Sequence, residues 1–476
     1  MTDVHEEILS GIALTDLRSE HRGPVLVLGD PGYDEARRVW NGMHDRRPAL
    51  IARCLTASDV SAVLRHAVAA DVPVTVRGGG HNVAGTAVSD DSVMIDLSLM
   101  RAVTVDPAAE QAEAEGGCLL GEVDAATAPY GLACPAGVVS HTGLGGLALG
   151  GGYGWLARKW GLTCDHILAA EVVLPDGSVV EVSESQHPEL LWALRGGGGN
   201  FGIVTRFTLR LRPVGPVYHH AAVFGPNEAP AALEQYRRFA AGQSSDMHAV
   251  GAFKVAGQQE WIPERLRGEP ALFLTAVWLG DPADGPAAVA PLFGTVEPAG
   301  SVARVMPYLE LQGLGDHGEP HGNRYFTKSC YLSDLASDPV AELVEAARDI
   351  RSPLSSIDFE FLCGAISGPA NEDSAFPRRE APYICTASAQ WIDPQHDAEN
   401  IAWTRNTVAR LAAWTYGGAY VNYLQDEPAD RVVEVYGEAR YRRLAAVKNS
   451  YDPRNVLRSN QNIRPTSGTA HLPSER

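Results

Sequence analysis

The sequence predicts an α+β fold with two domains, and three observations support this prediction. The chain has 476 residues, which is more than one hydrophobic core usually serves. Short strand patterns alternate with helix patterns up to about residue 215, whereas longer strand-like runs alternate with helices from about residue 217. Pro213 and Pro216 separate these two regions. The expected parts are a first domain, a second domain on a broad antiparallel sheet, a C-terminal segment and a disordered tail, over residues 1–215, 216–425, 426–465 and 466–476.

Short elements follow one another in the first domain. Residues 57–72 repeat apolar side chains at helical intervals, which predicts a helix, and residues 73–76 form a strand-like run that enters a glycine turn. Residues 167–183 form a hairpin, with Pro-Asp-Gly at its turn. Further strand-like runs lie at 92–98, 102–107 and 201–214.

The second region has longer elements and no glycine triplets. Residues 270–280 and 383–393 read as strands, and residues 338–350 and 398–414 read as helices. The chain then returns to a helix that ends at Asp452-Pro453, followed by a polar loop. A polar loop in this place indicates that the loop docks against another part of the protein.

Charge and hydropathy exclude several classes of partner. The formal net charge of −19 disfavours nucleic acid and anionic membrane, since both favour clustered Lys and Arg. No apolar run approaches the ~18 residues of a transmembrane helix, and the start lacks a secretory pattern. We therefore expect a cytoplasmic protein with a small-molecule substrate.

The seven cysteines are widely scattered and form no CxxC pair. This pattern disfavours a disulfide framework or a zinc site, so we expect buried, reduced thiols and no metal.

Three glycine clusters lie at residues 78–80, 143–152 and 196–199. Such turns expose backbone N–H groups that can bind anions, so the clusters predict an extended ligand with a pyrophosphate; the alternative is three unrelated tight turns. His81 directly follows the first cluster, where it either ends a turn or meets that ligand.

One of these clusters superficially matches a dinucleotide fingerprint. Residues 143–148 read GLGGLA, but no clear strand precedes them and Gly150-Gly151-Gly152 would interrupt the helix that the fingerprint requires. A nicotinamide-dinucleotide domain is therefore disfavoured.

Six motifs together resemble those of the FAD-linked oxidases of the vanillyl-alcohol oxidase superfamily, in the berberine-bridge-enzyme-like branch that includes gluco-oligosaccharide oxidases. The motifs are RGGGHNVAG, CPAGVVSHTGLGGLALGGGYG, LWALRGGGGNFGIVT, SAFPRREAPY, YVNY and YDPRNVLRSNQNIRP, at residues 77–85, 134–154, 191–205, 374–383, 420–423 and 451–465. The resemblance implies a PCMH-type FAD-binding domain over residues 1–215 and a substrate domain over 216–425. It also implies that the segment 426–465 returns to the FAD domain.

The resemblance further implies FAD bonded covalently through its 8α carbon to His81. Family members with a second bond to a cysteine have that cysteine where this chain has Val139, so we expect a single link. Cys134 aligns with an ordinary apolar position. His141 either faces the flavin or fills the loop. The other implied cofactor contacts are Arg77, Gly78, Gly79, Gly80, Asn82, Gly85, Val139, Ser140, Thr142, Gly143, Gly146, Gly151, Gly152, Tyr153, Ile203, Val204, Asn460 and Asn462.

Oxidation of an alcohol by hydride transfer to flavin N5 also needs a base near the hydroxyl. The resemblance implies a tyrosine of the YVNY motif, with Tyr423 as first choice and Tyr420 as second. We expect a strand that turns both rings into one pocket and neighbours that lower the phenol pKa; the alternative is that both rings only pack. Further candidates are Asp358, Glu360, Tyr325 and Lys328.

These expectations describe an FAD oxidase that acts on a hydroxyl or C–H group of a sugar or secondary metabolite. O2 would reoxidise the flavin and give H2O2. The alternatives are a dehydrogenase with another electron acceptor and a redox-silent FAD-binding protein.

Overall fold

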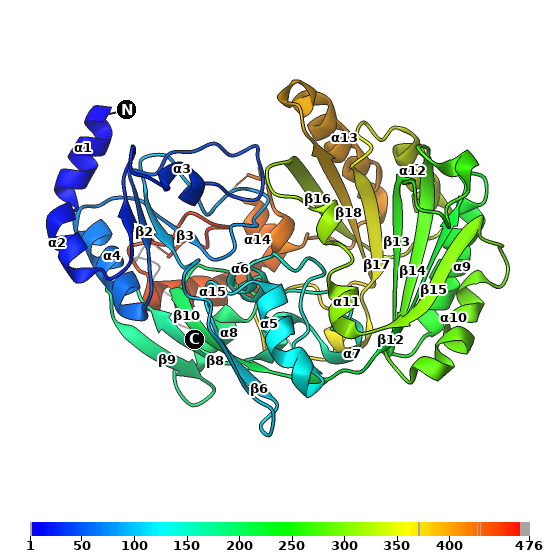
Figure 1. Ribbon diagram of the computed structural model, residues 1–476, viewed down its shortest axis with the longest axis horizontal. Helices are drawn as coiled ribbons and strands as arrows, with labels where there is room; N and C mark the ends of the chain where they lie inside the picture. Colours follow the sequence, from blue (N-terminus) through cyan, green and yellow to red (C-terminus); the bar gives the residue numbers. More distant parts are fainter. Residues whose placement is uncertain (1, 370–371, 426, 429, 467–476) are drawn as a thin grey trace, which may run out of the picture.

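Two α+β halves lie side by side in the computed structural model, which describes residues 2–369, 372–425, 427–428 and 430–466 (Figure 1). The expected tail at 466–476 lies outside this part of the chain except for its first residue. Within the described residues, the strands form sheets of four, five and seven strands and one two-stranded pair. Over these same ranges, no helix has the length and apolar character needed to cross a membrane.

The first half contains a mixed sheet and an antiparallel sheet. In the mixed sheet, β2, β4 and β3 run parallel and β1 pairs antiparallel with β2. Its order is β1 (Val25–Leu26), β2 (Leu50–Arg53), β4 (Val93–Asp96) and β3 (Val74–Arg77). The antiparallel sheet has the order β5 (Val103–Asp106), β6 (Gln111–Glu115), β10 (Ile203–Arg210), β8 (Ile167–Val173) and β9 (Val179–Ser183).

Local sequence signals explain the elements around these sheets. The helix α4 (Ala57–Ala69) begins with a capping box, in which the Thr56 hydroxyl accepts a hydrogen bond from the Asp59 backbone N–H at 3.2 Å. The other helices of this half are α1 (Thr2–Gly11), α2 (Leu14–Glu20), α3 (Tyr33–Ala36), α5 (Leu120–Thr127), α6 (Leu144–Leu149), α7 (Ala157–Trp160) and α8 (Pro188–Leu194).

The second half is built on the broad antiparallel sheet that the sequence predicts. Its order is β15 (Gly300–Met306), β12 (Val217–Phe224), β14 (Pro270–Trp278), β13 (Met247–Val255), β17 (Ser356–Phe361), β18 (Tyr383–Trp391) and β16 (Arg324–Leu332). The pair β7 (Leu132–Ala133) and β11 (Arg212–Pro213) precedes it, so the chain enters this sheet between residues 213 and 217.

The two faces of this sheet have different surroundings. Because side chains alternate along a strand, Ala249 and Phe253 of β13 lie in the core beneath the helices, whereas Val250 and Lys254 face the first half. Figure 1 shows the helices on the outer side of the sheet. They are α9 (Ala229–Gly242), α10 (Gly285–Phe293), α12 (Ser337–Arg348) and α13 (Asp397–Arg410), while α11 (Tyr308–Gln312) lies on the inner side.

The C-terminal segment packs on the first half. Its helices α14 (Arg431–Tyr436) and α15 (Glu438–Tyr451) follow the second-half sheet in the chain, and α15 contacts α8. The Lys448 ammonium is fully buried and donates to Asp452 Oδ2 at 2.7 Å and to the carbonyls of Asn200 and Leu457 at 2.7 and 2.9 Å. These bonds hold the loop after α15 against the third glycine cluster.

Candidate active site

A cavity of about 990 Å³ lies between the two halves. Residues of all three glycine clusters line it on the side of the first half, together with the C-terminal loop. The inner face of the seven-stranded sheet lines the other side, through β13, β17 and β18. The cavity therefore places backbone-rich walls opposite polar side chains, and its volume is that of a small-molecule or cofactor site.

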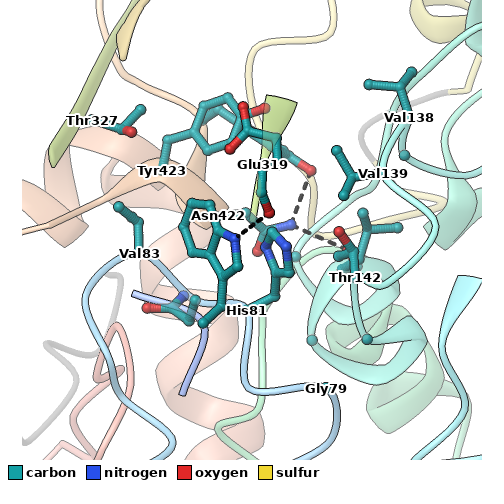
Figure 2. Close-up of a pocket in the computed structure, with 18 of the residues that line it drawn as sticks. Gly79, His81, Val83, Val138, Val139, Thr142, Glu319, Thr327, Asn422 and Tyr423 are labelled. Atoms are coloured by element: carbon teal, nitrogen blue, oxygen red, sulfur yellow. Dashed lines mark hydrogen bonds between the residues drawn. The ribbon is translucent and has the colours of Figure 1, made fainter. Parts of the chain in front are cut away.

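The first two glycine clusters touch each other. A Cβ atom on Gly79 would lie 2.4 Å from the Gly143 nitrogen, and one on Gly143 would lie 2.3 Å from the Gly79 nitrogen. Side chains at these positions would push the two loops apart. In contrast, no described atom lies within 4 Å of a Cβ built on Gly146 or Gly199, so both positions border open space. Figure 2 shows Gly79 beneath His81 at this wall.

Most of the predicted cofactor contacts line this cavity. They are Gly78, Gly79, Gly80, His81, Asn82, Val139, Thr142, Gly143, Gly146, Tyr153, Ile203, Val204 and Asn460. Asn460 also has a buried Oδ1 atom without a hydrogen-bond partner among the described residues, which a donor on a bound ligand could satisfy.

Six predicted contacts lie outside the described cavity lining, and packing explains several of them. The Arg77 guanidinium pairs with Asp96, with Nε–Oδ1 and Nη2–Oδ2 distances of 2.9 and 2.5 Å. Gly85 has a φ of 63° and lies against the His44 ring, where a Cβ would come within 2.4 Å. Ser140 donates through its backbone N–H and its hydroxyl to Asp316 at 2.8 and 2.5 Å.

The glycines at 151 and 152 serve packing between segments rather than the cavity. A Cβ on Gly151 would lie 2.6 Å from the Phe376 ring, and a Cβ on Gly152 would lie 2.3 Å from the Thr163 hydroxyl. Asn462, the sixth of these residues, also lies outside the described lining.

His81 is held between aromatic rings. Its imidazole stacks on Trp40 with ring centroids 4.2 Å apart, and Trp40 in turn stacks on Tyr325 at 3.6 Å. Its Nε2 atom lies 3.1 Å from His141 Nδ1. Burial, and then the neighbouring His141 and His321, lower the pKa of His81 to about 3. The imidazole is therefore neutral at physiological pH and keeps a nucleophilic lone pair.

His141 contacts two other histidines. Its ring lies 5.0 Å from that of His81 and 4.9 Å from that of His321, and it is not among the described residues that line the cavity.

No cysteine lines the cavity in the described part of the chain. Val139, where the resemblance predicts no second flavin bond, lines the cavity (Figure 2). Cys134 is 2% exposed, and burial raises the pKa of its thiol well above the ordinary range, so it is an inert core residue.

The YVNY motif forms a 3₁₀-helix over Val421–Tyr423, so the predicted strand is wrong. Tyr420 and Tyr423 are three positions apart, which would put them on opposite faces of a strand. In a 3₁₀-helix, side chains three apart eclipse, and the two rings lie 4.9 Å apart on one side. Both line the cavity.

The two tyrosines differ in what their hydroxyls contact. The Tyr420 oxygen accepts hydrogen bonds from the Gly152 backbone N–H and from Asn422 Nδ2 at 2.8 and 2.9 Å, and Tyr420 is 3% exposed. Among the described residues, the Tyr423 oxygen accepts a single, longer hydrogen bond, from the Tyr153 hydroxyl at 3.5 Å. Tyr423 is therefore the better placed of the two to bind a ligand.

Burial raises the pKa of both tyrosines, so the predicted lowering is wrong. Carboxyl groups reinforce this effect at Tyr423, since a nearby negative charge opposes ionisation of the phenol. They belong to Glu360, Asp358 and Glu319.

Asp358 and Glu360 project from β17 into the cavity, as alternate residues on one strand face. Burial raises the pKa of Asp358 to about 6, although a 2.5 Å hydrogen bond from Ser356 and the charge of Lys254 oppose this. The Glu360 carboxylate lies 3.3 Å from His248 Nε2.

Sequence reasoning missed two charged residues of the cavity. Lys254 lies on the inner face of β13, and alternation along that strand could have revealed it. Glu319 lies in the loop after α11, which carries no readable pattern. Burial and the charge of Asp358 raise the pKa of Glu319 to about 8. Its backbone carbonyl accepts a hydrogen bond from Trp40 Nε1 at 3.0 Å (Figure 2).

Tyr325 and Lys328 do not reach the cavity in the described structure. Tyr325 is fully buried and donates its hydroxyl proton to the Pro320 carbonyl at 2.6 Å. Lys328 contacts the Gln425 carbonyl and the Glu427 carboxylate.

Known proteins are similar to this chain over most of its length. The FAD binding domain family matches residues 48–183, and the family described as berberine and berberine like matches residues 419–464. (R)-6-Hydroxynicotine oxidase of Paenarthrobacter nicotinovorans is 30% identical over 458 residues, covering 93% of this chain and 97% of that protein.

Solved structures share the fold of this chain. The crystal structure of 6-hydroxy-D-nicotine oxidase from Arthrobacter nicotinovorans has a TM-score of 0.84 at 28% identity, covering 93% of this chain and 98% of that one. Glucooligosaccharide oxidase from Acremonium strictum, which carries a 6-S-cysteinyl, 8α-N1-histidyl FAD, has a TM-score of 0.83 at 22% identity. The match covers 97% of this chain and 100% of the oxidase, and the two proteins share the fold.

Proposed function

The chain belongs to the FAD-linked oxidoreductases of the berberine-bridge-enzyme-like family, and from this we propose that it is an oxidase with one histidyl-linked FAD. The substrate is a sugar or a secondary metabolite, oxidised at a hydroxyl or C–H group. O2 accepts the electrons and becomes H2O2. Two of the similar proteins, a 6-hydroxynicotine oxidase and a glucooligosaccharide oxidase, have named substrates within this range.

The residues of the cavity fit FAD. The contact between Gly79 and Gly143 brings two backbone segments together, and Gly146 and Gly199 leave room beside them. The unpartnered Asn460 Oδ1 offers an acceptor on the same side. We assign cofactor binding to these residues and to the neighbouring glycines 78 and 80. FAD, when bound, supplies the hydride acceptor of the reaction.

The single observation that carries the histidyl link is the neutral, clamped imidazole of His81 at the cavity wall. Stacking on Trp40 fixes its plane, and its pKa of about 3 keeps it unprotonated. With Val139 in the cavity and no described thiol beside it, the proposed attachment is single.

The other side of the cavity supplies the acid–base chemistry. Tyr423 keeps its proton at neutral pH because its pKa is raised, so we assign it the role of a donor that orients the substrate oxygen. Asp358, with a pKa of about 6, is largely ionised at pH 7 and is suited to accept the hydroxyl proton.

Denaturing electrophoresis of the purified protein under ultraviolet light tests the link. The wild-type band should fluoresce and the His81→Ala band should not, although the folded variant should still bind FAD reversibly. Fluorescence that persists in the variant would refute His81 as the attachment site.

Turnover assays test the oxidase assignment with 6-hydroxynicotine and gluco-oligosaccharides as first substrates. H2O2 formed in step with substrate loss identifies an oxidase. Flavin bleaching under anaerobic conditions without H2O2 in air identifies a dehydrogenase. If no substrate of either class bleaches the flavin, the proposed range of substrates is refuted.

A further inference from the structure

A second histidine contacts the proposed attachment residue. His141 Nδ1 lies 3.1 Å from His81 Nε2, and the two rings are tilted by 38° with centroids 5.0 Å apart. His141 lies in the loop whose Ser140 is fixed to Asp316 of the second half by two hydrogen bonds. This second histidine is thus held in place from both halves of the molecule.

The contact engages the Nε2 atom of His81 and leaves Nδ1 outside it. A neutral imidazole carries one N–H donor and one lone pair, and its hydrogen bonds determine which nitrogen has which. When His141 Nδ1 accepts a hydrogen bond, the proton of His81 is on Nε2 and the lone pair is on Nδ1. Stacking on Trp40 at 4.2 Å restricts rotation of the ring out of this arrangement.

We propose that His141 is a positioning residue for flavin attachment, which keeps His81 in the tautomer whose Nδ1 is the nucleophile. This inference rests on the histidyl link of the proposed function. It concerns how the link forms and not how the substrate is oxidised, so it can be tested without a known substrate.

The attachment step balances with O2 as the oxidant. A bond forms between His81 Nδ1 and the 8α carbon, while one hydrogen is lost from the 8α methyl group and one proton from Nε2. The two electrons pass through the flavin to O2, which takes up both protons and becomes H2O2.

The chain contains a matched control in His321. Its ring is 4.9 Å from that of His141 but 6.2 Å from that of His81, in an edge-on orientation. Replacing His321 perturbs the same cluster of rings and leaves the contact between His81 and His141 in place.

The test follows covalent attachment over time after FAD is added in air to full-length apoprotein from a riboflavin-limited host. Acid-stable flavin is measured in wild type, His141→Ala, His141→Asn and His321→Ala, and FAD binding is measured separately by fluorescence quenching. The Asn side chain can place its Oδ1 where His141 has Nδ1, so it can accept the same hydrogen bond.

We expect attachment to be at least tenfold slower in His141→Ala than in wild type, with reversible FAD binding retained. His141→Asn and His321→Ala should stay within about threefold of wild type. Equal rates in His141→Ala and wild type would overturn the inference alone, and so would an Asn variant as slow as the Ala variant. Wild-type protein that never forms acid-stable flavin would instead refute the histidyl link, and the inference with it.

Discussion

Replacement of Lys448 by methionine removes a fully buried cation from the base of the C-terminal loop. The ammonium makes three hydrogen bonds, to Asp452 and to the carbonyls of Asn200 and Leu457. The Asp452 carboxylate is 0% exposed and would remain buried with its cation gone. Loss of one partner from such a pair costs about 3–5 kcal/mol of unfolding free energy, because the other charge is left uncompensated.

The same substitution should loosen the packing around the bound flavin, since residues 457, 459, 460 and 461 of this loop line the cavity. Urea unfolding, followed by flavin fluorescence and by far-ultraviolet circular dichroism, measures both effects. The matched control is Arg410→Ala, which removes a 2.8 Å ion pair with Glu342 whose side chains are 47% and 37% exposed. Exposed pairs contribute about 0–1 kcal/mol. If Lys448→Met and Arg410→Ala destabilise the protein equally, the buried pair does not hold the loop.

Three further predictions concern the cavity. Glu319→Gln should raise stability relative to wild type at pH 9 and leave it unchanged at pH 3. The pKa of Glu319 is about 8 in the folded protein and about 4.3 in the unfolded chain. Wild type therefore loses unfolding free energy as the pH rises from about 4.3 to about 8, and thermal melts of both proteins at pH 3 and pH 9 check this. In a His81→Ala background, Val139→Cys should restore acid-stable flavin if residue 139 lies against the flavin ring, and mass spectrometry of the intact chain would report the added FAD. Gly79→Ala should destabilise the fold by about 1–3 kcal/mol through its 2.4 Å clash, whereas Gly146→Ala should spare the fold and weaken FAD binding; equal thermal stability of the two variants would contradict this reasoning.

The sequence predicted the features that depend on local composition. The glycine clusters, the longer strand runs after residue 217 and the polar loop at the end each have a signature within a short stretch of chain. In the structure these stretches become the cavity wall, the seven-stranded sheet and the loop that lines the cavity. These features could be predicted because glycine turns and strand alternation each leave a pattern within a few neighbouring residues.

The failures came from contacts between distant segments. Gly151 has to be glycine because Phe376 packs on it, and no local pattern announces a neighbour so far along the chain. Glu319 enters the cavity because its loop bonds to Trp40. The raised pKa of Tyr423 likewise depends on carboxyl groups from β17 and from that loop, and these meet only in the folded protein.

The column of rings formed by Tyr325, Trp40 and His81 crosses the boundary between the two halves. Tyr325 belongs to β16 of the second-half sheet, whereas His81 follows β3 of the first half. A cofactor bonded to His81 would thus be connected, through this column of rings, to the sheet that carries the proposed acid–base residues. Under the proposed histidyl link, a displacement of that sheet would act on the attachment residue through these two stacked contacts.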